Sequence, residues 1–177
     1  VSDKIVSIHG FTDDDWSSLL GDIEQLKPLA VELNMSCPNV GEIDWPTTLF
    51  ADALATGVPV VVKLPPVRYA LMARQAIEAG VRVFHCCNTL PVSAGGISGQ
   101  PLKPVSLACI ATLRSWPEGG SLTIIGGGGI AKVEDIDEYV DAGVQHVALG
   151  TRTMNPVLLL TYSPITGLVD HAIARLG

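Results

Sequence analysis

The chain has 177 residues, of which 47% are apolar and 16% are charged, and its mean hydropathy is +0.38. This length suits one domain with a sizeable core, and the apolar share fits strands that are buried on both faces. The net charge of −7 argues against a nucleic-acid binder, and no apolar run is long enough to span a membrane.

The cysteines and the start of the chain indicate the compartment. The four cysteines, at positions 37, 86, 87 and 109, lack the spacing of a metal site, and adjacent Cys86 and Cys87 make a poor disulfide framework. No signal peptide is visible after Val1. We therefore expect a reduced, cytoplasmic protein without a bound metal.

Short β-branched runs alternate with amphipathic segments along the chain, as a parallel α/β sheet requires. Strands are expected at residues 5–9, 30–34, 58–64, 81–87, 122–125 and 146–149. Six βα units in series, with no low-complexity linker between them, predict one domain.

Three segments between these strands carry helix signals. The first begins at Thr12 or Asp13, either of which can cap it, and runs to about Gln25. The others span residues 69–79 and 133–142, and each is followed by a glycine that can end a helix.

Six parallel units are fewer than a closed (β/α)8 barrel contains, since such a barrel has eight strands and about 250 residues. The sheet is therefore either open or a piece of a larger barrel. The first strand begins almost at the start of the chain, which fits a barrel cut at its front.

The segment from Asn34 to Asn39 breaks an apolar strand into a loop, because Pro38 has no N–H for a strand ladder. The amides of Asn34 and Asn39 offer donors and acceptors to a planar ligand. Cys37 lies between them and can transfer a proton if its pKa is near the working pH. A polar turn with an inert thiol explains this segment, taken alone, equally well.

Further polar and glycine-rich residues follow the next two strands, and ligands of parallel α/β folds gather at the carboxyl ends of strands. Lys63 ends the third strand and either reaches the rim or meets an anion inside. Asn88 and Thr89 follow the fourth strand. The glycine-rich stretch 94–99 reads as a loop that can bring backbone close to a ligand.

Four glycines at residues 126–129 follow the fifth strand, and Gly150 and Thr151 follow the sixth. The N–H groups of such loops can bind an anion, and loops on adjacent strands at this end of a barrel often hold phosphate. A glycine run can also be a plain turn, but the two loops together favour a phosphate site. Without a Walker motif or a complete dinucleotide fingerprint, a mononucleotide fits better than ATP or NAD.

These motifs occur together in one order: NMSCPN at 34–39, VKLPP at 62–66, NT at 88–89, GGISG at 95–99, IGGGGI at 125–130 and GT at 150–151. In this order they resemble the dihydroorotate dehydrogenases, which are FMN-dependent (β/α)8-barrel enzymes of pyrimidine synthesis. The resemblance implies an α/β fold of the TIM type that lacks about its first two strands. It also implies a single FMN-binding domain over residues 1–177, incomplete at its N-terminal side.

The resemblance implies a role for each matched residue. Cys37 matches the catalytic base of class 1 enzymes, which takes a proton from dihydroorotate while a hydride passes to FMN, giving orotate. The matched substrate-binding residues are Asn34, Asn39, Asn88 and Thr89. The matched cofactor-binding residues are Asn34, Lys63, Cys87, Gly99, Gly128, Gly129, Gly150 and Thr151, the last four around the phosphate.

Some features leave alternatives open. Dihydropyrimidine dehydrogenase has a related barrel, but it generally carries His at the position of Asn39. Arg152 stands where the family commonly has a small residue, and the stretch 89–95 is short, so the subclass and the electron acceptor stay open. A non-catalytic α/β domain that binds phosphate or flavin is the alternative function. The unpaired edge strands of a partial barrel predict a homo-oligomer. We expect no nucleic-acid partner, because of the net charge, and no membrane span, because no apolar run is long enough.

Overall fold

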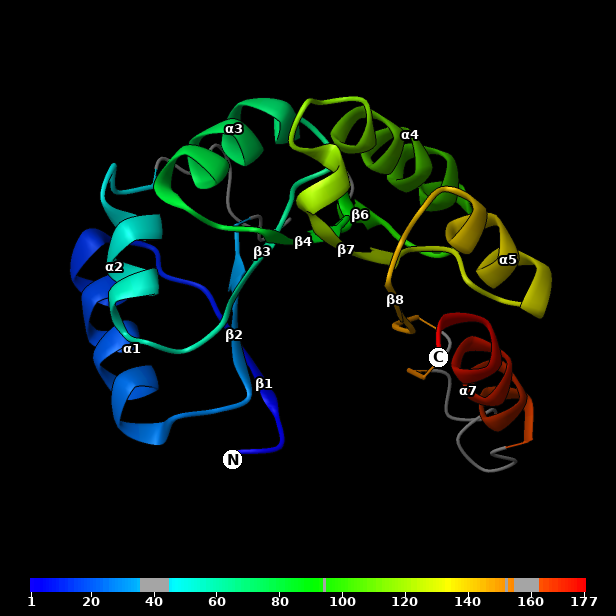
Figure 1. Cartoon of the computed structure of the whole chain (residues 1–177), viewed down its shortest axis with the longest axis horizontal. Helices are drawn as coiled ribbons and strands as arrows, with labels where there is room; N and C mark the ends of the chain where they lie inside the picture. Colours follow the sequence, from blue (N-terminus) through cyan, green and yellow to red (C-terminus); the bar gives the residue numbers. More distant parts are fainter. Residues whose placement is uncertain (36–44, 94, 152, 155–162) are drawn as a thin grey trace.

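The computed structural model of the chain describes residues 1–35, 45–93, 95–151, 153–154 and 163–177. Its main sheet has six parallel strands in the order β1-β2-β3-β4-β7-β8. These are β1 (Ile5–Ile8), β2 (Ala30–Asn34), β3 (Val60–Lys63), β4 (Val83–Cys86), β7 (Thr123–Gly127) and β8 (His146–Ala148). The sheet curls into a half-barrel, which confirms the predicted class of fold (Figure 1).

Helices cover the outer side of the half-barrel (Figure 1). They are α1 (Asp13–Leu26), α2 (Leu49–Ala55), α3 (Tyr69–Ala79), α4 (Lys103–Arg114), α5 (Val133–Asp141) and α7 (Ser163–Leu176). None of the described helices is long and apolar enough to cross a membrane. Thr12 caps α1 as predicted, because its hydroxyl accepts the N–H of Asp15 and the Asp15 carboxylate accepts the N–H of Thr12.

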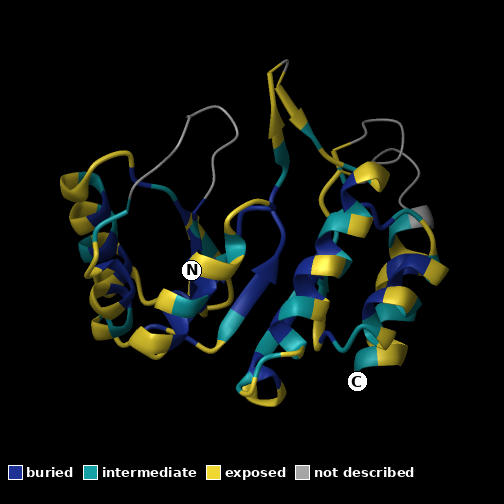
Figure 2. Ribbon diagram, turned by 90° about the horizontal axis from the view of Figure 1, so that it is seen from above, coloured by how far each residue is buried: buried dark blue, intermediate teal, exposed yellow. Residues whose placement is uncertain are grey.

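The two faces of the sheet differ in chemistry, since successive side chains of a strand alternate between faces. The outer face packs beneath the helices and is apolar, with Val31, Leu33, Val62, Phe84 and Ile124 all 0% exposed. Figure 2 shows this buried layer between the helices. The inner face instead carries the polar side chains of Ser7, Glu32, Asn34, Lys63 and His85.

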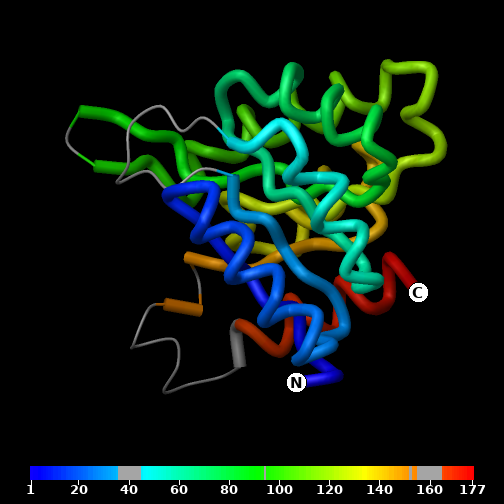
Figure 3. The backbone as a smooth tube through the Cα atoms, turned by 90° about the vertical axis from the view of Figure 1, so that its left-hand side faces the viewer, coloured from blue at the N-terminus to red at the C-terminus, as the bar shows by residue number. Residues whose placement is uncertain are grey.

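A small hairpin is the main departure from the predicted elements. Strands β5 (Leu90–Val92) and β6 (Gly95–Ile97) pair antiparallel and project beyond the main sheet (Figure 3). The prediction of a loop over 94–99 is therefore wrong for Gly95–Ile97. Glycines and Pro91 disfavour a strand in the sequence, but a two-stranded arm consists only of edge strands, where proline is tolerated.

The run of glycines at 126–129 is also not one loop, because Gly126 and Gly127 belong to β7. A Cβ on Gly126 would lie 2.5 Å from Cδ1 of Tyr139, so this glycine makes room for the Tyr139 ring on the outer face. Only Gly128 and Gly129 lie beyond the strand, with φ of +104° and +76°.

Candidate active-site pocket

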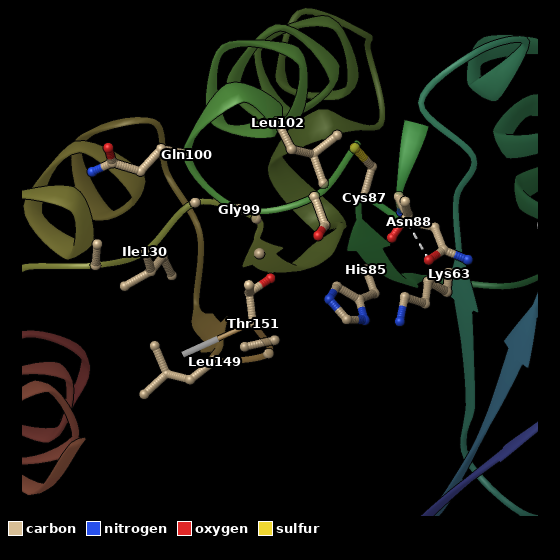
Figure 4. Close-up of a pocket in the computed structure, with 18 residues that line it drawn as sticks. Lys63, His85, Cys87, Asn88, Gly99, Gln100, Leu102, Ile130, Leu149 and Thr151 are labelled. Atoms are coloured by element: carbon tan, nitrogen blue, oxygen red, sulfur yellow. Dashed lines mark hydrogen bonds between the residues drawn. The ribbon is translucent and has the colours of Figure 1, made fainter. Parts of the chain in front are cut away.

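A pocket of about 680 Å³ lies at the carboxyl ends of β3, β4, β7 and β8, where ligands of barrel folds bind (Figure 4). Its lining includes nine of the eleven residues predicted to bind cofactor or substrate. They are Lys63, Cys87, Asn88, Thr89, Gly99, Gly128, Gly129, Gly150 and Thr151. Segments that are far apart in the sequence therefore meet in one cavity.

The loop at Gly128 and Gly129 has the conformation that the phosphate prediction requires. Both residues have positive φ, which only glycine adopts readily. A Cβ on Gly129 would lie 2.9 Å from Cα of Gln100, so no other residue fits there without a shift. Among the described residues, neither glycine's N–H has a backbone acceptor. These N–H groups fit an anion such as a phosphate.

Gly150 lies on the neighbouring strand end and faces open space. A Cβ built on it would meet no atom of the described residues within 4 Å. The carbonyl oxygen of Gly150 accepts the N–H and the hydroxyl of Thr153, which holds this turn in place. A site that binds a phosphate needs such free space beside the backbone.

A buried hydrogen-bond network fixes the backbone behind the pocket. The Ser106 hydroxyl donates to the carbonyl oxygen of Gly127 at 2.6 Å and accepts the N–H of Cys87 at 3.0 Å. The Tyr139 hydroxyl donates to the carbonyl oxygens of Gly127 and Gly128, at 3.0 and 2.7 Å. Burial raises the pKa of Tyr139 well above its ordinary value, so this hydroxyl stays a donor.

Two of the predicted substrate amides lie next to each other. The Asn88 side-chain amide donates to Oδ1 of Asn34 at 2.7 Å, and Oδ1 of Asn88 accepts the N–H of Thr89 at 2.9 Å. His9 supports the same place, because its Nδ1 lies 2.7 Å from the carbonyl oxygen of Asn34. Asn34 does not line the pocket itself, but it contacts Asn88, which does.

Lys63 lies near an anion on the inner face of the sheet, which is one of the two positions predicted for it. Its Nζ lies 3.9 Å from Oε1 of Glu32, while the lysine also lines the pocket. Oε1 of Glu32 accepts the hydroxyl of Ser7, and Oε2 lies 2.7 Å from Nδ1 of His85. Burial raises the pKa of Glu32, but the contacts with His85, Lys63 and Ser7 outweigh it and lower that pKa below its ordinary value.

Cys87, which lines the pocket, is a poor proton acceptor. Burial raises the pKa of Cys87 to about 11, so its thiol remains protonated near neutral pH. The predicted base Cys37 and the predicted substrate ligand Asn39 lie outside the described residues, as does Arg152.

Several residues of the site were missed from the sequence. His85, Gln100, Leu102, Gly127 and Ile130 line the pocket, and Glu32 and Ser106 support it from behind. Glu32 and His85 stand in strands that read as apolar, and a charged residue within such a run was the available signal. Nothing in the sequence pairs residues that lie 53 positions apart.

A curled parallel sheet with its pocket at the carboxyl ends of the strands places the chain among the α/β-barrel proteins. A family model described as dihydroorotate dehydrogenase matches residues 3–159. The chain belongs to the dihydroorotate dehydrogenase family.

Curated relatives agree with this assignment. The protein named dihydroorotate dehydrogenase B (NAD(+)), catalytic subunit, from Listeria monocytogenes is 37% identical over 174 aligned residues, covering 83% of this chain and 56% of the relative. The protein of the same name from Oceanobacillus iheyensis is 35% identical over 173 residues. The chain thus spans about half the length of the curated relatives it matches.

The solved structures show the same fold at lower identity. Ligand-free dihydroorotate dehydrogenase from Eimeria tenella superposes with a TM-score of 0.73 over 93% of this chain and 56% of that one, at 19% identity. The likeness shows that the two proteins share the same fold over the part of that structure that this chain matches.

Proposed function

We propose that this chain carries most of the flavin site and the proton-accepting loop of an FMN-dependent enzyme that oxidises dihydroorotate to orotate in pyrimidine synthesis. The observation that supports this most is that one pocket is lined by Lys63, Asn88, Gly129 and Thr151, which come from four strand ends. These are residues that the family resemblance assigns to cofactor and substrate. The expected binding partner is therefore a small molecule, dihydroorotate or its product orotate.

In this proposal Gly128, Gly129, Gly150 and Thr151 hold the phosphate through backbone N–H groups and open space. The backbone at Cys87 and Gly99 would line the ring system of bound FMN. Lys63 supplies positive charge beside it, which favours a reduced, anionic flavin. Bound FMN would supply the hydride acceptor of the reaction.

Asn88, Thr89 and Asn34 hold the substrate ring in this proposal, since their amide and hydroxyl groups match its carbonyl and N–H edges. The family resemblance assigns Asn39 to the same ring. Cys37 takes the proton from C5 of dihydroorotate as the C6 hydride leaves. The hydrogen bond between Asn88 and Asn34 holds these two amides in place before substrate binds.

The names of the curated relatives bear on the electron acceptor. They are catalytic subunits of an NAD(+) type of the enzyme, which favours NAD⁺ as acceptor and a second subunit as its route. A homo-oligomer and a cytoplasmic location stay predictions.

The test is the flavin content of the protein expressed from its natural reading frame, followed by anaerobic addition of dihydroorotate. We expect a yellow protein whose flavin absorbance bleaches with dihydroorotate. A colourless protein would favour the non-catalytic alternative. A yellow protein that dihydroorotate leaves unbleached would retain the cofactor but reject the substrate.

A further inference from the structure

The inner face of the sheet carries a cluster of charged and polar side chains, of which the proposed chemistry uses only Lys63. The cluster consists of Ser7, Glu32, Lys63 and His85, from four neighbouring strands. Glu32 and His85 are each only 9% exposed. Burying a carboxylate is costly unless hydrogen bonds and charges compensate, so this arrangement is a built feature of the pocket floor.

The contact with Glu32 fixes which nitrogen of His85 carries a proton. An ionised carboxylate only accepts hydrogen bonds, and Oε2 of Glu32 lies 2.7 Å from Nδ1 of His85. The low pKa of Glu32 keeps this carboxylate ionised at neutral pH. Nδ1 therefore holds the proton, and in the neutral ring Nε2 has a free lone pair.

The opposite edge of the ring faces the pocket. His85 lines the cavity, and the close-up shows its ring beside Lys63 (Figure 4). Nε2 lies 2.9 Å from where a Cβ on Gly127 would stand, so the glycine in β7 leaves room for this ring. No described residue hydrogen-bonds to Nε2 of His85.

We propose that His85 is a further ligand-contacting residue of this pocket, which accepts an N–H group of the bound heterocycle at Nε2. Glu32 is its positioning residue, because it holds the ring in the tautomer that leaves Nε2 unprotonated. Lys63, the other charged group that faces His85, balances the charge of Glu32. The inference rests on the proposed flavin site and adds a contact to it.

Two substitutions separate a ligand contact from a merely structural role. The amide of His85→Asn can occupy the place of Nδ1 and donate to Glu32, but it lacks any atom at the place of Nε2. His85→Gln can present a polar atom at the place of Nε2. His146→Asn is the matched control, since His146 lies on β8, the same parallel sheet, outside the pocket and exposed.

The measurement is FMN affinity of the natural full-length apoprotein by flavin fluorescence, with thermal melting of each apoprotein. We expect His85→Asn to weaken FMN binding about 3- to 10-fold, the usual worth of one hydrogen bond, with little change in melting. His85→Gln should recover part of the affinity. The control should bind as the parent does. Unchanged affinity in His85→Asn would overturn the role of His85.

Nitrogen NMR of the histidine rings gives a readout that needs no turnover. In mildly alkaline buffer we expect the His85 signal of the apoprotein to show a proton on Nδ1 only, and its Nε2 signal to shift when FMN is added. In Glu32→Gln the two tautomers should mix, because a side-chain amide can donate as well as accept. A proton on Nε2 in the parent would overturn the proposal.

Failure of the two proposals is distinguishable. If the parent protein binds no FMN, the flavin function fails and the role of His85 fails with it. If the parent binds FMN and His85→Asn binds it as tightly, only the role of His85 fails.

Discussion

The Ser106 hydroxyl joins α4 to the strand that carries the glycine loop, through its 2.6 Å hydrogen bond to the carbonyl oxygen of Gly127. The same oxygen atom of Ser106 accepts the N–H of Cys87 at the end of β4. One fully buried hydroxyl therefore sets the spacing between two walls of the pocket. A site that holds a rigid cofactor needs such fixed backbone positions.

We expect Ser106→Ala to destabilise the protein by about 1–3 kcal/mol, because it leaves the buried N–H of Cys87 without an acceptor. FMN binding should weaken as well, since the glycine loop loses one support. Chemical denaturation measures the first effect and flavin fluorescence the second. Ser115→Ala is the control, because the Ser115 hydroxyl is exposed at the end of the same helix. Equal stability of the two variants would contradict this role.

Gly150→Ala tests the phosphate cradle with little risk to the fold. Its new methyl group would meet no atom of the described residues within 4 Å, so the melting temperature should stay near that of the parent. We expect weaker FMN binding, because the methyl group takes space that the phosphate needs. Gly120→Ala, also without neighbours, is the matched control outside the pocket. The cradle is misplaced if Gly150→Ala and the control bind FMN equally well.

The cysteines should differ in reactivity toward iodoacetamide. The contact with the Cys109 thiol and burial raise the pKa of Cys86 well above its ordinary value, and burial raises that of Cys87 to about 11. In native protein near neutral pH we therefore expect almost no labelling at Cys86 and Cys87. Peptide mass spectrometry reads the sites, and unfolded protein should label at all four cysteines. Fast labelling of Cys87 in the native protein would contradict its raised pKa.

Glu32 should make stability depend on pH at the acidic end. Its pKa is lower in the folded chain than in the unfolded one, so its contribution is present above the ordinary carboxyl pKa of about 4.3 and disappears as pH falls through the lowered value. Glu32→Gln should therefore be less stable than the parent at neutral pH. The gap in melting temperature should narrow in acid. Exposed Glu24→Gln should show no such gap, and a parallel pH profile for all three proteins would contradict the linkage.

The strands could be predicted because the signals that define them lie in consecutive residues. The apolar run before Asn34 and the alternation with helices define β2 and its end. The glycines of the pocket could be recognised because they are clustered in the sequence. The structure confirms the parallel half-barrel and brings Lys63, Asn88 and Gly129 to one cavity.

What could not be predicted depends on distant pairing. The hydrogen bond between Glu32 and His85 crosses β3, and sequence spacing does not show that the two side chains meet on the inner face. Ser106 looks like an ordinary polar residue of a helix until the fold places it behind Cys87. Gly126 reads as a loop glycine, but the Tyr139 ring decides its place in β7.

The central claim is tested most directly by stopped-flow reduction of bound FMN by dihydroorotate in the parent and in Cys37→Ala, at several pH values. We expect a rate about 10²–10⁴-fold lower in Cys37→Ala, the usual cost of losing a general base. Cys37→Ser should retain part of the rate, displaced to higher pH because a hydroxyl is a weaker acid than a thiol. Substrate affinity should change little, since Asn34 and Asn88 remain. A Cys37→Ala rate within a few-fold of the parent would contradict the account.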